Sequence, residues 1–215
     1  MPKALASGAE RDESGSVPSL GAEEALVLTD DVLLDQLHAH PSRRERRAER
    51  RRLRHLDALS ARLAELHAVR DLLAQAASVV DAGWVKGAWF TVTTGAGDRA
   101  VTAHDLDLLV DRPVTGACLV GGVVQAAGGP ASVRSQLVQR TLDLTWHALR
   151  EDPSQPVRWC PGQPVRMMHV LELTHWNDAP ERTRTDVLHL LRAAKETAEL
   201  QLHRCRANQA VLAAS

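Results

Sequence analysis

The stretch between Ser42 and Gly83 constrains the fold of this 215-residue chain more than any other part. Ser42 is a good helix N-cap, and Glu45 three residues later completes the pattern of a capping box. The residues that follow are apolar at spacings of mostly three and four, namely Leu56, Leu59, Leu63, Leu66, Leu73, Ala77 and Val80. This pattern predicts one long helix over 43–82, with Gly83 as the C′ residue that ends it.

The apolar stripe of that helix has two interpretations. A heptad-like seam would make it a coiled coil, and the segment 56–80 would then be a surface for self-association. Alternatively, the stripe is the core face of one helix in a bundle. Val69 and Leu72 make it wider than a narrow seam, which favours the core face.

Composition limits what can fill the core. The chain is 44% hydrophobic but only 3% aromatic, so the core must consist mainly of Leu, Val and Ala. Residues 89–93 show an alternating pattern and are rich in strand-forming residues. Residues 95–98 then turn the chain and residues 100–102 lead it back alongside, which predicts a small β-hairpin. Helices are expected over 133–149 and 183–206, the latter with Thr183 and Asp186 as a capping box, and a loop over 151–164. Two segments are less defined, 116–127 as a short buried helix or apolar turn and 167–173 as a short apolar helix or strand.

These elements predict a mainly α fold, a small helical domain with one β-hairpin and a long N-terminal helix. Four regions follow. Residues 1–41 are an acidic, largely disordered arm with a possible short helix at 23–38, and residues 42–82 are the long helix, basic in its N-terminal half. Residues 83–206 form a helical globular domain on which 56–82 pack, and residues 207–215 are a tail.

Cysteine usage and hydropathy indicate a cytoplasmic protein. Cys118, Cys160 and Cys205 are odd in number and share no short spacing, which argues against a disulfide framework and for a reducing compartment. The N-terminal residues are polar and acidic, unlike a signal peptide. Residues 113–133 carry no charge but contain several Gly and Pro, so no membrane span is expected.

Charge is the clearest functional signal. Residues 43–54 contain eight arginines and only two acidic residues, Glu45 and Glu49. The segment therefore has a net charge of plus six. Such a helix can follow the phosphates of a nucleic acid or bind an acidic protein surface, and without interleaved aromatic residues its nucleic-acid binding would be independent of sequence. The candidate binding residues are Arg43, Arg44, Arg46, Arg47, Arg50, Arg51 and Arg54.

Two other interpretations of this charge remain open. The arginines can belong to a solvated helix end, stabilised by pairs with Glu45 and Glu49. Alternatively, residues 1–41, with eight acidic and two basic side chains, can fold back on the basic helix and shield it.

An enzymatic alternative uses Cys118, His175 and Asn177. A thiolate near a helix N-terminus, a histidine base and an orienting amide would form the arrangement of a cysteine-dependent hydrolase or transferase. The apolar residues that follow Cys118 instead indicate a small buried side chain. A structural role is favoured for Trp176-Asn177-Asp178 as well, with Trp176 buried and the two polar residues holding an Asx-type turn.

No metal or cofactor is predicted. The ten histidines form no His-x-x-x-His pair and the cysteines no Cys-x-x-Cys pair, so a zinc site would need ligands from distant segments. The pair Gly121-Gly122 lacks the other residues of a phosphate-binding loop.

Three short motifs carry a resemblance to a known family: Gly83-Trp84-Val85-Lys86-Gly87, Cys118-Leu119-Val120-Gly121, and Trp176-Asn177-Asp178 ahead of residues 183–188. In order and spacing the chain resembles, over about residues 60–198, an uncharacterised family with a domain of unknown function, found in actinobacteria and their phages. The basic and acidic extension before residue 56 and the proline-rich segment 151–164 depart from the family pattern. The resemblance implies domain boundaries and no activity.

Overall fold

The computed structural model describes residues 42–109, 112–157, 159–160 and 162–214. The chain divides into two compact units, residues 1–48 and 49–215. The arm expected over 1–41, with its possible helix at 23–38, lies outside the described residues. The described part of the first unit is the start of α2, which runs over Arg43–Ala82. Its capping box is present: the Ser42 amide donates to Glu45 Oε2 at 2.6 Å, and the Glu45 amide donates to Ser42 Oγ at 3.2 Å.

The second unit is mainly helical, as predicted. After α2 it contains β1 (Phe90–Thr94), β2 (Gly97–Val101), the 3-10 helix η1 (Leu106–Leu109), β3 (Val114–Ala117), α3 (Leu119–Ala126), the 3-10 helix η2 (Pro130–Ser132), α4 (Gln136–Arg150), α5 (Gln163–Asp178) and α6 (Arg184–Ala214). The predicted fold class, a helical domain with a hairpin and a long N-terminal helix, is confirmed. No helix within the described residues is long and apolar enough to cross a membrane.

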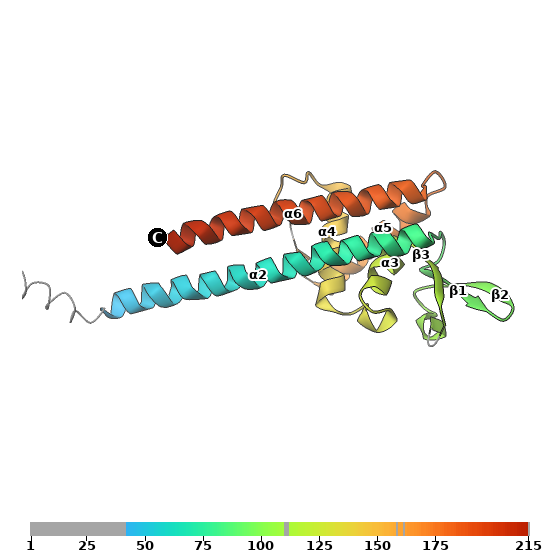
Figure 1. Cartoon of the computed structure of the whole chain (residues 1–215), viewed down its shortest axis with the longest axis horizontal. Helices are drawn as coiled ribbons and strands as arrows, with labels where there is room; N and C mark the ends of the chain where they lie inside the picture. The colour runs from blue at the N-terminus through green and yellow to red at the C-terminus, as the bar shows by residue number, and fades with distance from the viewer. Residues whose placement is uncertain (1–41, 110–111, 158, 161, 215) are drawn as a thin grey trace, which may run out of the picture. The chain divides into compact units, whose positions relative to one another are not determined.

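Helix α6 lies beside the second-unit part of α2 and runs antiparallel to it (Figure 1). Polar side chains link the two helices at both ends of this pair. Arg184 Nη1 donates to the carbonyl of Asp81 at 3.0 Å, and Gln209 Nε2 donates to Ser60 Oγ at 3.0 Å. Side-chain contacts between helices distant in sequence therefore set their register.

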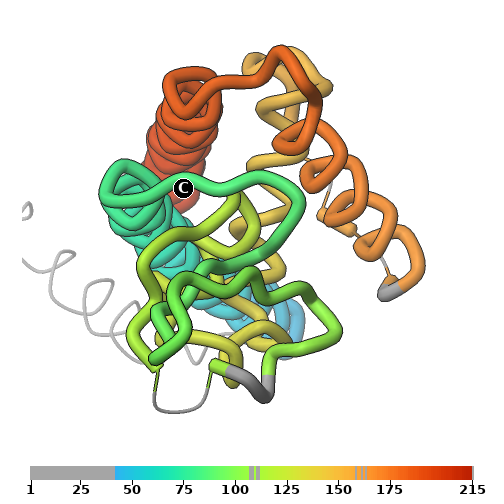
Figure 2. The backbone as a smooth tube through the Cα atoms, turned by 90° about the vertical axis from the view of Figure 1, so that its right-hand side faces the viewer, coloured from blue at the N-terminus to red at the C-terminus, as the bar shows by residue number. Residues whose placement is uncertain are grey.

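The core contains buried residues of α2, α3, α4, α5, α6 and all three strands, and Figure 2 shows α3 and α4 lying among α2, α5 and α6. The first six residues of α3 are all buried, and Gly122 brings α3 so close to α2 that a Cβ there would meet Val80. From Leu66 onward the stripe of α2 is buried within the chain, with Leu66, Val69, Leu72, Leu73, Ala76 and Val80 at its centre. This part of the stripe serves as a core face, and self-association through 56–80 stays a prediction.

The predicted hairpin is present, with a third strand beside it. Strands β1 and β2 pair antiparallel, Phe90 opposite Val101, around the expected turn. Strand β3 pairs with the other edge of β1, in the order β2-β1-β3. Residues 116 and 117 were expected to begin a helix or an apolar turn, and this was wrong. A four-residue strand carries too little periodicity to be recognised, and its partner is distant in sequence.

Helix α2 ends at Ala82 as predicted, but the role expected for Gly83 was wrong. Among the glycines that the structure describes, those with positive φ are Gly87, Gly97, Gly128 and Gly129, so Gly83 is not a left-handed C′ residue. A Cβ at Gly83 would instead collide with the carbonyl of Thr115. The Gly83 carbonyl also accepts from the Ala117 amide at 2.8 Å. Glycine is required here because β3 passes close to the end of α2.

The last two helices are longer than expected. The segment 167–173 is part of the 16-residue α5, which continues through Trp176, Asn177 and Asp178, so the expected Asx-type turn was wrong. Helix α6 begins with the predicted capping box, in which the Thr183 amide donates to Asp186 Oδ2 at 2.8 Å. It continues to Ala214, through residues expected to be a tail.

Candidate functional site

The predicted polyanion-binding residues are exposed. Every residue from Ser42 to Arg51 is exposed, as is Arg54, so this part of α2 covers no core. At about 100° per residue, the seven candidate arginines project within an arc of about 160° around the helix, whereas Glu45, Glu49 and Arg52 project on the opposite side. We call Arg43, Arg44, Arg46, Arg47, Arg50, Arg51 and Arg54 the arginine face.

The other side of the helix is used within the protein. Arg52 donates from Nε to the Leu212 carbonyl at 3.1 Å and from Nη2 to the Ala213 carbonyl at 2.8 Å. These carbonyls are at the C-terminus of α6, where the helix itself provides no donors. Glu49 lies 3.6 Å from Arg52, and Glu45 is held in the capping box. Both acidic residues of the segment are thus engaged on the side opposite the arginine face.

Cys118 has a structural environment. Its side chain is fully buried among the aliphatic residues of the core, and Sγ accepts from the Gly121 amide at 3.3 Å as the N-cap of α3. Burial raises the pKa of Cys118 to about 12, outweighing the amides at the helix start that lower it. His175, its proposed partner, is exposed on α5. This geometry disfavours a thiolate at Cys118.

Asn177 is fully buried and joins three segments of the chain. Its Oδ1 accepts from Trp84 Nε1 at 2.9 Å and from the Leu119 amide at 3.1 Å. Its Nδ2 donates to the Val85 carbonyl at 3.1 Å and to Asp178 Oδ1 at 2.8 Å, and Asp178 Oδ1 also accepts from the Gly87 amide at 3.0 Å. We call this set the Asn177 junction. It unites the three motifs of the family resemblance, and every polar atom of the amide is used for structure.

A second buried polar cluster was not predicted. Asp143 on α4, Cys160 in the loop after it and His169 on α5 place one ligand-type atom each within 4.8 Å of one another. Cys160 Sγ lies 3.4 Å from His169 Nδ1, and Asp143 Oδ1 lies 3.6 Å from the same nitrogen. We call these three residues the Asp143 cluster.

The surroundings of the Asp143 cluster hold its side chains in place. The Trp146 ring stacks on the His169 ring with centroids 3.8 Å apart, and Trp146 Nε1 donates to Glu172 at 2.8 Å. Arg166 Nε lies 3.7 Å from Asp143 Oδ2, which also accepts from the Cys160 amide at 3.3 Å. Burial, followed by the negative charge of Asp143, raises the pKa of the Cys160 thiol.

The sequence contains one signal for this cluster. Asp143 lies between Leu142 and Leu144, on a segment of α4 whose five residues 141–145 are all buried. A carboxylate in such a position needs a partner. The partners themselves could not be identified, because Cys160 and His169 are separated from it by a loop and a helix start.

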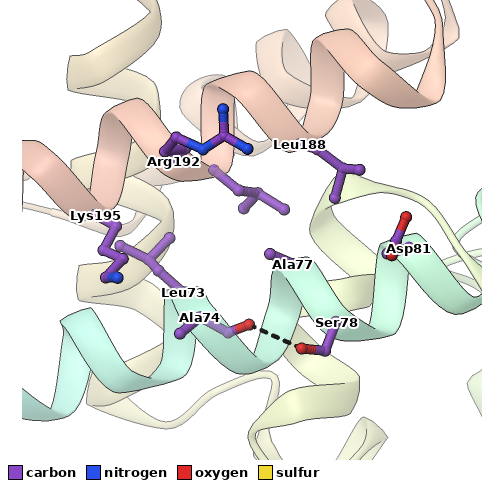
Figure 3. A pocket seen from close by; sticks show the side chains of 9 residues that line it. Leu73, Ala74, Ala77, Ser78, Asp81, Leu188, Arg192 and Lys195 are labelled. Atoms are coloured by element: carbon purple, nitrogen blue, oxygen red, sulfur yellow. Dashed lines mark hydrogen bonds between the residues drawn. The ribbon is translucent and has the colours of Figure 1, made fainter.

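A groove of about 330 Å³ lies between α2 and α6. Figure 3 shows Leu73 and Ala77 of α2 facing Leu188 and Arg192 of α6, with Asp81 and Lys195 also lining it. The Ser78 hydroxyl donates to the carbonyl of Ala74. The groove is lined by aliphatic and charged side chains and contains neither a cysteine nor a histidine. It combines apolar contacts with the Ser78 hydroxyl and the charged groups of Asp81, Arg192 and Lys195.

The chain matches no curated protein and no solved structure. Its residues 64–197 match a Family of unknown function (DUF6197). This span contains the Asn177 junction and the Asp143 cluster, whereas the arginine face precedes it. Because the match covers more than half of the chain, the protein belongs to this family of unknown function.

Proposed function

We propose that this protein is a non-enzymatic binding or accessory protein that contacts a polyanion, such as the phosphate backbone of a nucleic acid, through the arginine face of α2. The single observation that carries the proposal is the one-sided exposure of these arginines. Residues 42–51 are exposed throughout, and both acidic residues of the segment lie on the opposite side of the helix.

Electrostatics supports a backbone contact rather than base recognition. Arginine is planar, permanently charged and suited to paired hydrogen bonds with phosphate. Each neutralised phosphate releases counterions, so affinity rises with the number of arginines engaged and falls with salt. The segment has no aromatic side chain to stack on a base, which favours binding independent of sequence.

The experiment is fluorescence anisotropy of a labelled DNA duplex titrated with the full-length protein over a salt series. The test variant carries Arg43→Gln, Arg47→Gln, Arg51→Gln and Arg54→Gln. The matched control carries Arg99→Gln, Arg112→Gln, Arg134→Gln and Arg192→Gln, four exposed arginines outside the arginine face. Both variants lose the same charge.

We expect the test variant to lose most of its affinity and to reduce the slope of log affinity against log salt by roughly 0.9 for each phosphate that is no longer neutralised. The control variant should bind almost as the unmodified protein does. Equal reductions in affinity in the two variants would assign binding to net charge alone. No binding by the unmodified protein at low salt would overturn the nucleic-acid proposal.

The acidic residues 1–41 provide a second comparison. If this segment competes for the arginine face, replacing its eight acidic residues by their amides tightens DNA binding. An acidic protein surface is the other polyanion class that fits the charge, and it would compete with DNA for the same arginines. The proposal includes a cytoplasmic location, which is supported by three free cysteines.

The geometry gives little support to the alternative of a cysteine-dependent enzyme. Cys118 is buried and caps a helix, while His175 is exposed on another element. A thiol-dependent activity lost in Cys118→Ala but retained in Cys205→Ala would restore that alternative.

A further inference from the structure

The Asp143 cluster lies outside the proposed polyanion site and has a different chemistry. The geometry points to a binding site for one divalent transition-metal ion of the zinc type, held by a carboxylate oxygen of Asp143, Sγ of Cys160 and Nδ1 of His169. The ligand types, their spacing and an unpartnered buried oxygen support this site.

The three ligand types suit zinc. Thiolate, imidazole and carboxylate are its usual protein ligands, and three protein ligands with one open position are typical of sites that also bind water or a small ligand. Magnesium and calcium prefer sites made of oxygen alone.

Two of the three ligand separations match those expected around a shared ion, and all three ligand atoms lie within 4.8 Å of one another. With Zn–S of about 2.3 Å and Zn–N or Zn–O of about 2.0–2.1 Å at tetrahedral angles, ligand atoms lie about 3.3–3.6 Å apart. The observed separations are 3.4 Å from Cys160 Sγ to His169 Nδ1 and 3.6 Å from Asp143 Oδ1 to the same nitrogen. Both neighbours approach one imidazole nitrogen. In a catalytic triad, the nucleophile and the carboxylate would contact opposite nitrogens of the ring.

Asp143 Oδ1 supplies a second, independent observation. Asp143 is 1% exposed, and Oδ1 has no hydrogen-bond partner among the described residues, although Oδ2 accepts from the Cys160 amide. The 3.6 Å to His169 Nδ1 exceeds the length of an N–H···O hydrogen bond, so a proton on that nitrogen does not satisfy the oxygen. A cation between the two atoms would satisfy it.

The surroundings pre-organise the site. The stacked ring of Trp146 fixes the plane of the His169 imidazole. Arg166 donates to Gln139 Oε1 at 2.6 Å and to the Cys160 carbonyl at 3.4 Å, which joins α4, α5 and the loop. Ligand orientation by such outer contacts is a general property of metal sites. Cys160 and His169 are 8% and 9% exposed, so the site lies just beneath the surface.

The test is titration of the full-length, metal-stripped protein with Zn²⁺ and with Co²⁺ as a spectroscopic probe. We expect one equivalent per chain, a thiolate-to-Co²⁺ charge-transfer band, and a rise in Tm of about 5–10 °C at Zn²⁺ a hundredfold above Kd. Cys160→Ser and His169→Gln should weaken binding by more than the roughly 10- to 100-fold typical of an outer-contact change.

Two variants serve as matched controls. Cys205→Ser removes another buried cysteine, whose Sγ donates to the Leu59 carbonyl on α2, and His175→Gln removes an exposed histidine from the same helix as His169. Both should bind metal as the unmodified protein does. Stoichiometric binding that survives Cys160→Ser and His169→Gln would overturn the site, as would the absence of stoichiometric binding at micromolar Zn²⁺.

A measurement on the unmodified protein guards against variants that fail to fold. Alkylation of each cysteine is followed by mass spectrometry with and without one equivalent of Zn²⁺. Zn²⁺ should slow alkylation at Cys160 specifically. Equal rates at Cys160 with and without the ion would contradict the proposal, whatever the variants do.

Discussion

The arginine face and the Asn177 junction are both polar, but they relate to the fold in opposite ways. The arginine face is continuous in sequence and exposed, and its side chains could all be removed without opening the core. The Asn177 junction is assembled from residues near 85, 119 and 177, and the Asn177 side chain at its centre is fully buried.

The difference shows why burial decides what a polar side chain does. An exposed arginine keeps its hydration and remains available to a partner. The amide of Asn177 has lost its water, and each of its atoms replaces that water by a hydrogen bond within the chain. Substitutions should therefore change binding in the first region and stability in the second.

The largest expected effect is at Asn177. In Asn177→Ala, Trp84 Nε1, the Leu119 amide and the Val85 carbonyl lose a partner. Because each buried unsatisfied group costs about 1–3 kcal/mol, the free energy of unfolding should fall by about 3 kcal/mol or more. The measurement is denaturant unfolding followed by circular dichroism.

Asn208 is the matched control, because it is the other asparagine of the chain and is exposed on α6. Asn208→Ala should change stability by less than about 0.5 kcal/mol. Similar decreases in stability in the two variants would show that the junction does not contribute more than an ordinary surface residue.

Gly121→Ala should have the next largest effect. A Cβ at this position would collide with the backbone carbonyl of Trp89, which cannot move as a side-chain end can. We expect the free energy of unfolding to fall by about 2 kcal/mol, within the range for overpacking a core, in the same unfolding assay. Gly95→Ala is the control, since a Cβ there meets nothing within 4 Å. If Gly121→Ala left the free energy of unfolding unchanged, α3 and the residue before β1 would have room for a Cβ between them.

Alkaline pH provides a test at Cys118. Its ordinary pKa of 9.0 is raised to about 12 in the folded protein, chiefly by burial. The contribution of this thiol to the free energy of unfolding is complete below pH 9 and is lost as the pH rises toward 12. The loss is up to about 1.4 kcal/mol per pH unit, because the unfolded chain releases the thiol proton at lower pH than the folded protein does. With no Tyr in the chain, few other groups titrate in this window.

Chemical denaturation between pH 8 and 11 measures this effect. Cys118→Ala should lose part of the decline, while Cys160, whose pKa is also raised, chiefly by burial, contributes with the same sign. An unchanged decline in Cys118→Ala would contradict a buried, protonated thiol at this position.

The smallest effect on stability is expected on the arginine face. Arg43→Gln, Arg47→Gln and Arg51→Gln together should change the unfolding free energy by less than about 0.5 kcal/mol, because the side chains are exposed and Gln favours the helix about as well as Arg does. Arg52→Gln should lower it by about 1 kcal/mol, since it removes two hydrogen bonds to the end of α6. If the triple substitution destabilises the protein more than Arg52→Gln, the arginine face has a structural role.

Local signals in the sequence were sufficient for several elements. The capping boxes at Ser42 and Thr183, the extent of α2 and the β1-β2 hairpin all depend on residues a few positions apart, and all are present. The core face of α2 was recognisable because helical periodicity repeats over many turns. In each case the interacting groups are neighbours in the chain, so their spacing is visible without the fold.

Contacts between distant segments required the tertiary structure. The third strand, the reason for a glycine at position 83, and the bonds of Asn177 to Trp84, Val85 and Leu119 all involve partners more than twenty residues away. The same holds for the Asp143 cluster, which was not predicted and whose members Cys160 and His169 meet Asp143 only in the folded chain. Residue types and spacing determined which segments of this protein became helices and which side chains stayed charged and exposed. Tertiary packing determined which buried polar groups form hydrogen bonds with one another, because these bonds join segments that are close only in the folded chain.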